Sequence, residues 1–405
     1  MTRGPATGPP GRYNPVCATR RGTAEQSARV ATKPDMRTSN TAVATAAVLP
    51  TPSRDLPSAV KHRRYASLDL LRALAIVLVV HCHSASGFAE PPLSTVLKLG
   101  GKGVELFFVL SGWLLGRQLV LELERTGKIE LLRFWARRWM RTLPAYYGVL
   151  VIISVYILAR NGQPLRPEYL FFGQTYLAGM PYFGISWSLC VEEHFYLLVA
   201  PTILLFWRRP GLRWLIPLLM IVPTVCRVYG WYGAEYQTHV WYDACATGVL
   251  LAAASVKYRK QWDRLRPLAA WVAAATILIV VRDVAFAWRP EWRPAGGPLA
   301  PDPGILVYAL VFAVWVWFAA VHPNWIAGRI PGVRYLAERS YAIYLLHLEV
   351  ITAIRHLPPM PFVVTLGLVW IGSIAVAEVL FRMVERPGME LRDRFASTRS
   401  TSPGI

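Results

Sequence analysis

Apolar runs long enough to cross a lipid bilayer recur from Lys61 almost to the C-terminus of this 405-residue chain. A helix of about 20 apolar residues spans the hydrocarbon core, and a helix satisfies its own backbone hydrogen bonds in lipid. The pattern predicts an all-α fold, a polytopic membrane bundle of about ten transmembrane helices. The run at residues 169–179 is too short to cross and is expected to form a re-entrant or interfacial helix. We place the ten helices at residues 67–88, 99–120, 143–160, 187–207, 212–230, 238–256, 267–284, 304–322, 339–356 and 361–383.

Composition and charge support this assignment. Hydrophobic residues make up 54% of the chain and charged residues only 17%, whereas soluble domains carry about 25% charged residues. A net charge of +20 would favour nucleic-acid binding in a soluble chain. Here the loops after the second, fourth and sixth predicted helices are rich in Lys and Arg, and the opposite loops hold fewer, as is typical of cytoplasmic loops. We therefore expect both termini in the cytoplasm, contact with membrane lipids, and no nucleic-acid partner.

The ends of the chain differ in composition from its middle. Residues 1–62 are rich in Thr, Ala, Pro, Ser and Arg and show no amphipathic period, which is typical of a disordered tail. We divide the chain into a disordered basic N-terminal tail (1–62), a membrane domain (63–388) and a polar C-terminal tail (389–405). Met36 is a second candidate start, so the translation of residues 1–35 stays open. The five cysteines are scattered, so we expect neither a metal site nor a disulfide framework.

The first predicted helix carries four ionisable residues. Asp69 and Arg72 open it, and His81 and His83 lie in its outer half. At 3.6 residues per turn, the step from Arg72 to His83 returns to within about 20° of the same face, about 16 Å further along. His81 points to the opposite side. This face suits a substrate with a charged head at the cytoplasmic surface and a reactive group reaching inward. The alternative is a salt-bridged pair plus an unrelated packing histidine.

Further polar side chains occur inside other predicted spans. A charged group at membrane depth is costly, so it normally faces a cavity or a partner and marks function. The residues inside the spans are Glu105, Ser111, Glu192, Glu193, Asp243 and His347. Three arginines cluster at the cytoplasmic mouth just before the third predicted helix: Arg137, Arg138 and Arg141. Together with the first helix they indicate an enzyme.

At these residues the chain resembles the acyltransferase 3 family of bacterial membrane O-acyltransferases. The first helix matches the family's signature of an arginine, ten residues and a histidine at Arg72 and His83. Other elements that resemble the family, in its order, are FFVLSG (107–112), RRxxR (137–141), WSLxVEE (187–193), YxIYLLH (341–347) and ERP (385–387). His194 stands where the family usually has Gln and Cys190 where Ser is common, and His81 is an additional imidazole.

The resemblance implies a reaction and its partners. The family moves an acyl group, commonly acetyl, from acyl-coenzyme A to a sugar hydroxyl at the outer face of the bacterial cytoplasmic membrane. Acyl-coenzyme A is then a co-substrate, and no resident cofactor is expected. Arg137, Arg138 and Arg141 would hold the coenzyme A phosphates by charge-assisted hydrogen bonds, and Arg72 would guide the donor inward.

The same resemblance assigns the chemistry to His83. It would act as the general base for the attacking hydroxyl; a covalent acyl-imidazole is the other route, and the sequence does not separate the two. Glu192 or Glu193 would orient an imidazole or bind the acceptor. Five residues are assigned a supporting role, with interhelical packing as the first interpretation for most of them: Asp69, Glu105, Ser111, Asp243 and His347.

Two alternatives remain open at this point. Within the enzyme class, the acceptor is a secreted polysaccharide, a lipid-linked glycan, peptidoglycan or a small glycosylated metabolite. From another class, a multi-pass transporter of a sugar or lipid-linked substrate would also bury acids and histidines. A transporter is expected to show repeat symmetry and broken helices at matching positions, and the sequence shows neither.

Overall fold

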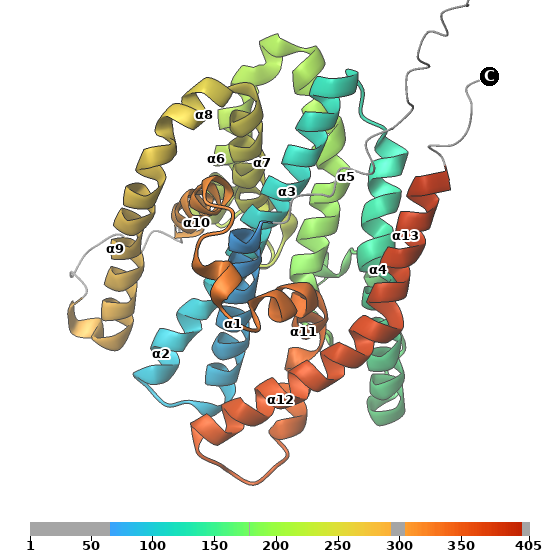
Figure 1. The fold of residues 1–405 in the computed structure, drawn as a ribbon. Coiled ribbons are helices and arrows are strands. Elements are labelled where there is room, and N and C mark those ends of the chain that lie inside the picture. Colours follow the sequence, from blue (N-terminus) through green and yellow to red (C-terminus); the bar gives the residue numbers. More distant parts are fainter. Residues whose placement is uncertain (1–64, 178, 293–303, 399–405) are drawn as a thin grey trace, which may run out of the picture. The chain divides into compact units, whose positions relative to one another are not determined.

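The computed structural model describes residues 65–177, 179–292 and 304–398, and the fold below concerns these residues. The predicted tail of residues 1–62 lies outside the described residues. Every regular element that the structure describes is helical, as expected (Figure 1).

The predicted apolar segments each coincide with a helix. The elements run α1 (Ala66–Phe88), α2 (Leu93–Lys98), α3 (Gly103–Thr126), α4 (Leu131–Asn161), α5 (Ser186–Arg208), α6 (Leu215–Val228), α7 (Tyr242–Lys257), α8 (Arg259–Leu265), α9 (Ala269–Trp288), α10 (Gly304–Val321), α11 (Val333–Ile354), α12 (Phe362–Leu380), a π-helical turn (Phe381–Glu385) and α13 (Arg386–Thr398). Short 3-10 turns connect several of them.

Six of the described helical segments are long and apolar enough to cross a membrane. The predicted count of ten crossings and the cytoplasmic position of both termini thus remain predictions. The four other predicted spans differ for physical reasons. Helices α6 and α7 are only 14 and 16 residues long, and α10 is apolar but short, over Ile305–Val321. The first two turns of α11 carry Arg334, Glu338 and Arg339. The six segments are Ala66–Phe88, Leu93–Thr126, Leu131–Asn161, Ser186–Arg208, Arg259–Trp288 and Phe362–Asp393.

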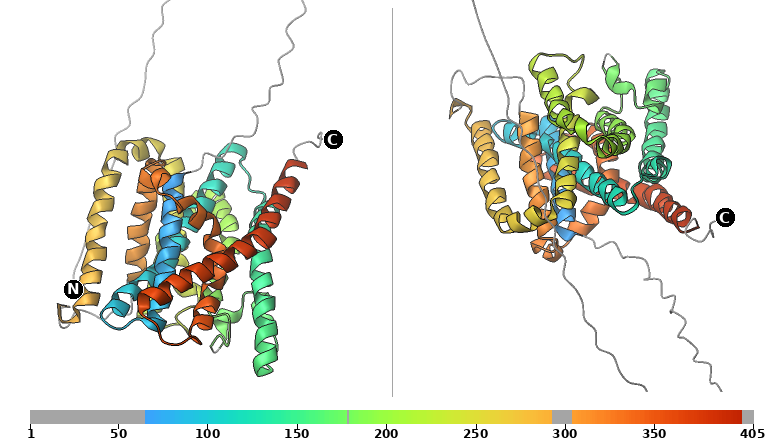
Figure 2. Two further views of the ribbon diagram at one scale, coloured as in Figure 1. Left: turned by 60° about the horizontal axis from the view of Figure 1, so that its bottom comes forward. Right: turned by 90° about the horizontal axis from the view of Figure 1, so that it is seen from above.

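The central helix of the bundle is α1, which packs against α3, α10, α11 and α12 (Figures 1 and 2). Beside it, α3 lies closely against α7 because glycines face backbone on both sides: Gly112 meets the Cys245 carbonyl, and Gly248 meets the Val109 carbonyl. Small residues permit such close approach between helices in membranes. The α1–α3–α7 group therefore forms a rigid frame for the residues that α1 and α3 carry.

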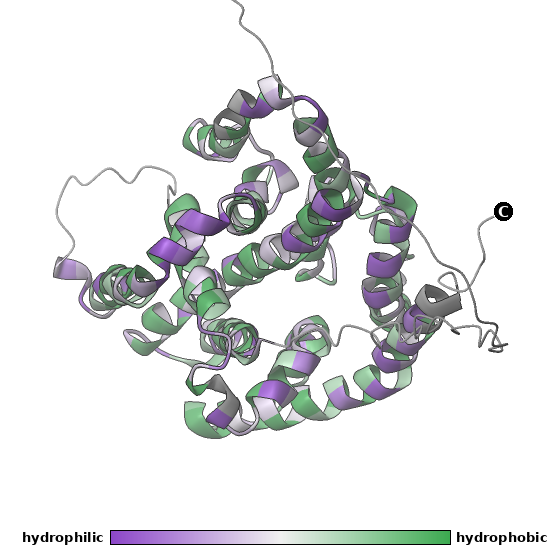
Figure 3. Cartoon of the chain, turned by 45° about the horizontal axis from the view of Figure 1, so that its top comes forward, coloured by the Kyte–Doolittle hydropathy of each residue, from purple (hydrophilic) through white to green (hydrophobic). Residues whose placement is uncertain are grey.

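Apolar side chains face outward on several helices, where a soluble protein would carry polar ones. Ile152 on α4, Leu278 on α9 and Ile371 on α12 are each more than 60% exposed. Figure 3 shows hydrophobic residues dominating long stretches of the helices, with hydrophilic turns between them. Lipid would cover these faces, and the chain is accordingly a multi-pass membrane protein.

Helix α4 begins earlier than predicted, at Leu131 rather than at residue 143. A start at residue 143 would place Pro144 in the first turn, where the backbone donor that proline lacks is not needed. Instead Pro144 lies inside α4, and the Met140 carbonyl that loses its helical donor faces Gly388 of α13. The extra turns place the RRxxR residues on a helix rather than in a loop.

The segment 169–179 is not the helix that was expected. It forms two short 3-10 turns, Pro167–Leu170 and Gln174–Tyr176. Hydroxyl groups from α4 bind its backbone: Tyr146 donates to the Tyr169 carbonyl at 2.8 Å and Tyr147 donates to the Leu170 carbonyl at 2.7 Å. The two tyrosine hydroxyls take the place of the backbone N–H groups that would bond these carbonyls in a helix.

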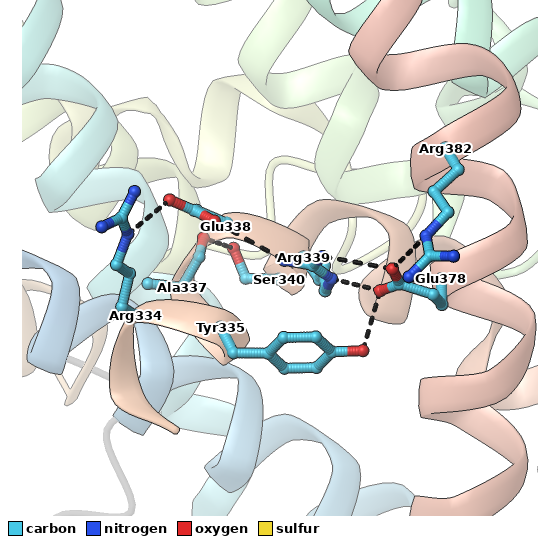
Figure 4. Close-up of polar contacts among 8 residues, drawn as sticks. All are labelled: Arg334, Tyr335, Ala337, Glu338, Arg339, Ser340, Glu378 and Arg382. Carbon is cyan, nitrogen blue, oxygen red and sulfur yellow. Dashed lines mark hydrogen bonds and ion pairs between the residues drawn. The ribbon is translucent and has the colours of Figure 1, made fainter. Parts of the chain in front are cut away.

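A charged cluster fixes α11 against α12 (Figure 4). Arg339 pairs with Glu378, and its guanidinium lies 3.9 Å from the Tyr335 ring centroid. Glu378 also accepts a hydrogen bond from Tyr335 at 2.8 Å and from Arg382 at 2.6 Å. Because α11 carries Ser340 and the YxIYLLH residues, this cluster sets their register. The predicted polar tail from residue 389 begins inside α13, which packs along α4 (Figure 1).

Candidate functional site

A polar pocket lies between α1, α3, α4, α5 and α11. Five of the predicted site residues line it: Arg72, Ser111, Arg138, Arg141 and Glu192. They come from four separate helices, so the bundle brings together residues that are up to 120 positions apart, from Arg72 to Glu192 (192 − 72 = 120). The aromatic part of the wall comes from Phe107, Phe108, Tyr341 and Tyr344.

Arg138 is the best-anchored arginine of the pocket. Its guanidinium lies 4.1 Å from the centroid of the Tyr196 ring and donates to the hydroxyl of the same residue. It also pairs with Glu192 at 3.7 Å. Ser111 donates to the other oxygen of Glu192 at 2.6 Å, so this serine has a polar role beyond helix packing. The network holds one carboxylate and one guanidinium at fixed orientations in the wall.

Positive charge exceeds negative charge in this wall. Three guanidinium groups, those of Arg72, Arg138 and Arg141, face one carboxylate, that of Glu192. Within the described part of the chain, Arg141 makes no hydrogen bond or ion pair. Like charges held this close repel one another, so the arrangement gains most from an anionic ligand. Arg137 does not line the pocket; its charged neighbours include Arg133 and Arg392.

Glu193 does not line the pocket, although it follows Glu192 directly. It is buried and accepts hydrogen bonds from Trp139 at 3.1 Å and from Thr142 at 3.0 Å. Successive helical residues are about 100° apart, at 3.6 residues per turn, so two adjacent acids cannot share one face. Through these two hydrogen bonds Glu193 links α5 to α4.

His83 lies outside the pocket and contacts a second histidine. Its Nδ1 atom is 2.9 Å from Nε2 of His347 on α11, and the two ring centroids are 5.0 Å apart. His347 is fully buried, and its Nδ1 faces the carbonyls of Tyr344 at 2.8 Å and Ile343 at 3.2 Å. The imidazole that Glu192 or Glu193 was expected to orient is therefore held by His347.

His81 occupies a different face of α1, as the helical register predicts. Its Nδ1 bonds the Val77 carbonyl at 2.8 Å, and its ring lies 5.9 Å from the Trp370 ring on α12. His83 faces α11 instead. The separation of the two histidines is confirmed.

Tyr344 lies between the pocket and the histidine pair. It lines the pocket, its ring is 5.7 Å from that of His347, and its hydroxyl is 2.6 Å from the Ser188 hydroxyl. Phe107, also in the wall, meets Tyr344 edge-on at 6.3 Å. Tyr344 thus contacts both the arginine pocket and the histidine pair.

The remaining supporting residues have structural partners. Asp243 forms a buried ion pair with Arg227 at 2.7 Å, and Glu105 pairs with Lys102 at 2.9 Å. Asp69 is buried in the first turn of α1 and does not line the pocket. No cluster of three or more His, Cys, Asp or Glu side chains suited to a metal ion occurs among the described residues.

Sequence reasoning missed several residues of the site and its surroundings. Tyr341, Tyr344 and Ser188 line the pocket, and their signal lay inside the YxIYLLH and WSLxVEE elements, which were used only to detect the resemblance. Arg227 was missed as well. It is a single basic residue at the end of a short apolar helix, and nothing in its neighbourhood points to Asp243.

The comparison with protein families decides the identity of this domain. The model described as "Acyltransferase domain" matches residues 65–381, which covers all of the elements described above up to the end of α12. The chain belongs to the acyltransferase 3 family. The resemblance drawn from the motifs is thereby confirmed, and the domain is of an enzyme class that transfers acyl groups.

Curated relatives agree with the family. The chain is 26% identical over 370 residues to the peptidoglycan O-acetyltransferase OatA of Listeria monocytogenes, covering 80% of this chain and 56% of that protein. It is 24% identical over 371 residues to the O-acetyltransferase OatA of Staphylococcus aureus, covering 79% and 56% respectively. The chain thus spans just over half the length of these relatives. No solved structure matches it.

Proposed function

We propose that this acyltransferase 3 protein is an integral-membrane O-acyltransferase of the bacterial plasma membrane. It moves an acyl group, in the simplest case acetyl, from acyl-coenzyme A to a hydroxyl of a sugar-containing acceptor. One observation carries the proposal: Arg72, Arg138 and Arg141 converge on one pocket, and Arg72 shares its helix face with His83.

The pocket chemistry supports a phosphorylated acyl donor. Guanidinium groups bind phosphate oxygens through paired, charge-assisted hydrogen bonds. Arg138 is already oriented by Tyr196 and Glu192, so little side-chain entropy is lost when it binds a phosphate. Arg141 supplies a guanidinium that makes no hydrogen bond or ion pair among the described residues. Arg137, which faces elsewhere, is withdrawn from the predicted donor set.

The transfer step is assigned to His83. The ring lies about 16 Å along α1 from Arg72, a separation that the long arm of coenzyme A would bridge past Tyr344. His83 takes the proton of the acceptor hydroxyl as its oxygen attacks the thioester carbonyl. The new C–O bond forms, the C–S bond breaks, and the proton passes to the departing thiolate. A covalent acyl-imidazole on His83 remains the alternative route.

The acceptor is proposed from the relatives. One of them is named a peptidoglycan O-acetyltransferase, which supports a glycan hydroxyl as the acceptor here. His83 lies in the outer half of α1 if the N-terminus is cytoplasmic, so a surface or exported glycan would reach it from outside. A lipid-linked glycan or a small glycosylated metabolite presents the same chemical group.

The proposal is tested with membranes that contain the full chain. They are incubated with acetyl-coenzyme A that is radiolabelled in the acetyl group, and the glycan fraction is counted after removal of lipid and free donor. Mild base should release the label as acetate, because an O-acetyl ester is hydrolysed readily. Membranes without the chain provide the control. Equal label in both preparations, across the glycan classes named above, would contradict the proposed function.

A further inference from the structure

The hydrogen bonds of His347 define its protonation. Its Nδ1 faces two backbone carbonyls, those of Tyr344 and Ile343. A carbonyl oxygen only accepts hydrogen bonds, so Nδ1 must carry the proton. The ring is fully buried, and an isolated buried cation would be costly. His347 is therefore neutral, and its Nε2 atom is left with a lone pair.

This lone pair fixes the tautomer of the neighbouring ring. Nδ1 of His83 is 2.9 Å from Nε2 of His347, and a hydrogen bond at that distance needs one proton between the two atoms. Because Nε2 of His347 has none, the proton lies on Nδ1 of His83. Neutral His83 then carries its lone pair on Nε2.

We propose that His347 is a positioning residue that holds His83 in the Nδ1–H tautomer and thereby presents a basic Nε2 to the acceptor hydroxyl. This inference rests on the proposed function, since it assigns a role within that reaction. When Nε2 takes the hydroxyl proton, His83 becomes an imidazolium, and its Nδ1–H bond to the neutral His347 ring strengthens. The proton leaves again from Nε2 to the thiolate of coenzyme A.

The membrane-embedded position of His83 explains why a second imidazole, rather than a carboxylate, orients it. In soluble hydrolases a carboxylate commonly orients the catalytic histidine. A carboxylate at this depth would be a buried charge before the reaction starts, with a corresponding desolvation cost. A neutral histidine gives the same direction to the hydrogen bond without that charge. Tyr344, three residues before His347 on α11, supplies the carbonyl that fixes the tautomer of His347.

The direct test is nitrogen-15 NMR of histidine-labelled full-length protein in lipid nanodiscs. We expect His83 with a protonated Nδ1 and a bare Nε2 in the wild type. His347→Leu removes the acceptor and should let His83 exchange between tautomers. His347→Gln keeps an amide oxygen near the position of Nε2 and should restore the Nδ1–H signal. An unchanged His83 tautomer in His347→Leu would overturn the inference, whatever the reaction proves to be.

Kinetics provide the second readout. His347→Leu should lower kcat for acetyl transfer about 100-fold, within the usual range for loss of general-base catalysis, and leave KM for acetyl-coenzyme A within twofold. His347→Gln should recover most of the lost rate. His81→Ala, on the other face of α1, serves as the matched control and should retain wild-type kcat. Parallel loss in the Leu and Gln variants would show a purely structural role. If wild-type protein transfers no acetyl group, the proposed function is wrong. The NMR experiment still tests the role of His347 in fixing the tautomer of His83 independently.

Discussion

Replacing Arg141 with glutamine should weaken donor binding while leaving the fold intact. The side chain lines the pocket, makes no hydrogen bond or ion pair among the described residues, and lies among other guanidinium groups, with the Glu385 carboxylate as an acidic neighbour. A hydrogen bond to a charged group contributes about 1.5–3 kcal/mol, and about 1.4 kcal/mol corresponds to a factor of ten. The dissociation constant of coenzyme A should therefore rise about 10- to 150-fold. Thermal stability should stay level or rise slightly, because repulsion with Arg72 and Arg138 is relieved.

The matched control for this variant is Arg137→Gln. It makes the same chemical change one turn away on α4, at a residue that does not line the pocket. Isothermal titration of coenzyme A into detergent-solubilised protein, at two salt concentrations, measures both affinities. Arg137→Gln should bind within twofold of wild type. Equal weakening by the two variants would refute the pocket as the donor site, since it would show only a diffuse effect of basic charge.

Three further predictions follow from the buried contacts. Arg227→Leu and Asp243→Leu should each lower stability by about 3–5 kcal/mol, because one buried charge loses its partner; the double variant should recover part of this loss in thermal unfolding. Glu193→Gln should lower the unfolding temperature, whereas Glu192→Gln should lower the affinity for coenzyme A. The reverse pattern would contradict the structural role of Glu193 and the pocket role of Glu192. Gly248→Leu should prevent assembly of α3 against α7, seen as loss of folded protein in size-exclusion chromatography.

Much of the fold was readable from local pattern. Each of the ten long apolar runs became a helix, because backbone hydrogen bonds in lipid leave few other choices, whereas the short run at 169–179 did not. The register of α1 also followed from the sequence, since the positions of His81 and His83 on a helix depend only on 3.6 residues per turn. The start of α4 was predicted too late because no local pattern reveals the distant neighbour of Pro144: Gly388 of α13 packs at the Met140 carbonyl that the proline leaves without its helical donor.

The sequence predicted most of the polar residues of the site but not which of them face one another. The basic cluster on α4 was visible, but which guanidinium faces α1 depends on how α4 is rotated in the bundle, so Arg137 was included with Arg138 and Arg141. Glu192 and Glu193 were ambiguous for the same reason. The partner of His83 required the packing of α11 on α1, a contact across 264 residues that no local signal encodes.

The central claim is that His83 acts as the general base of acyl transfer, and one comparison tests it most directly. Acetyl transfer from radiolabelled acetyl-coenzyme A to glycan is measured in membranes that carry wild type, His83→Ala or His81→Ala at equal abundance. We expect His83→Ala to lose at least about 99% of the label, consistent with loss of a general base, while His81→Ala labels glycan as wild type does. Labelling by His83→Ala at the wild-type rate would contradict the account.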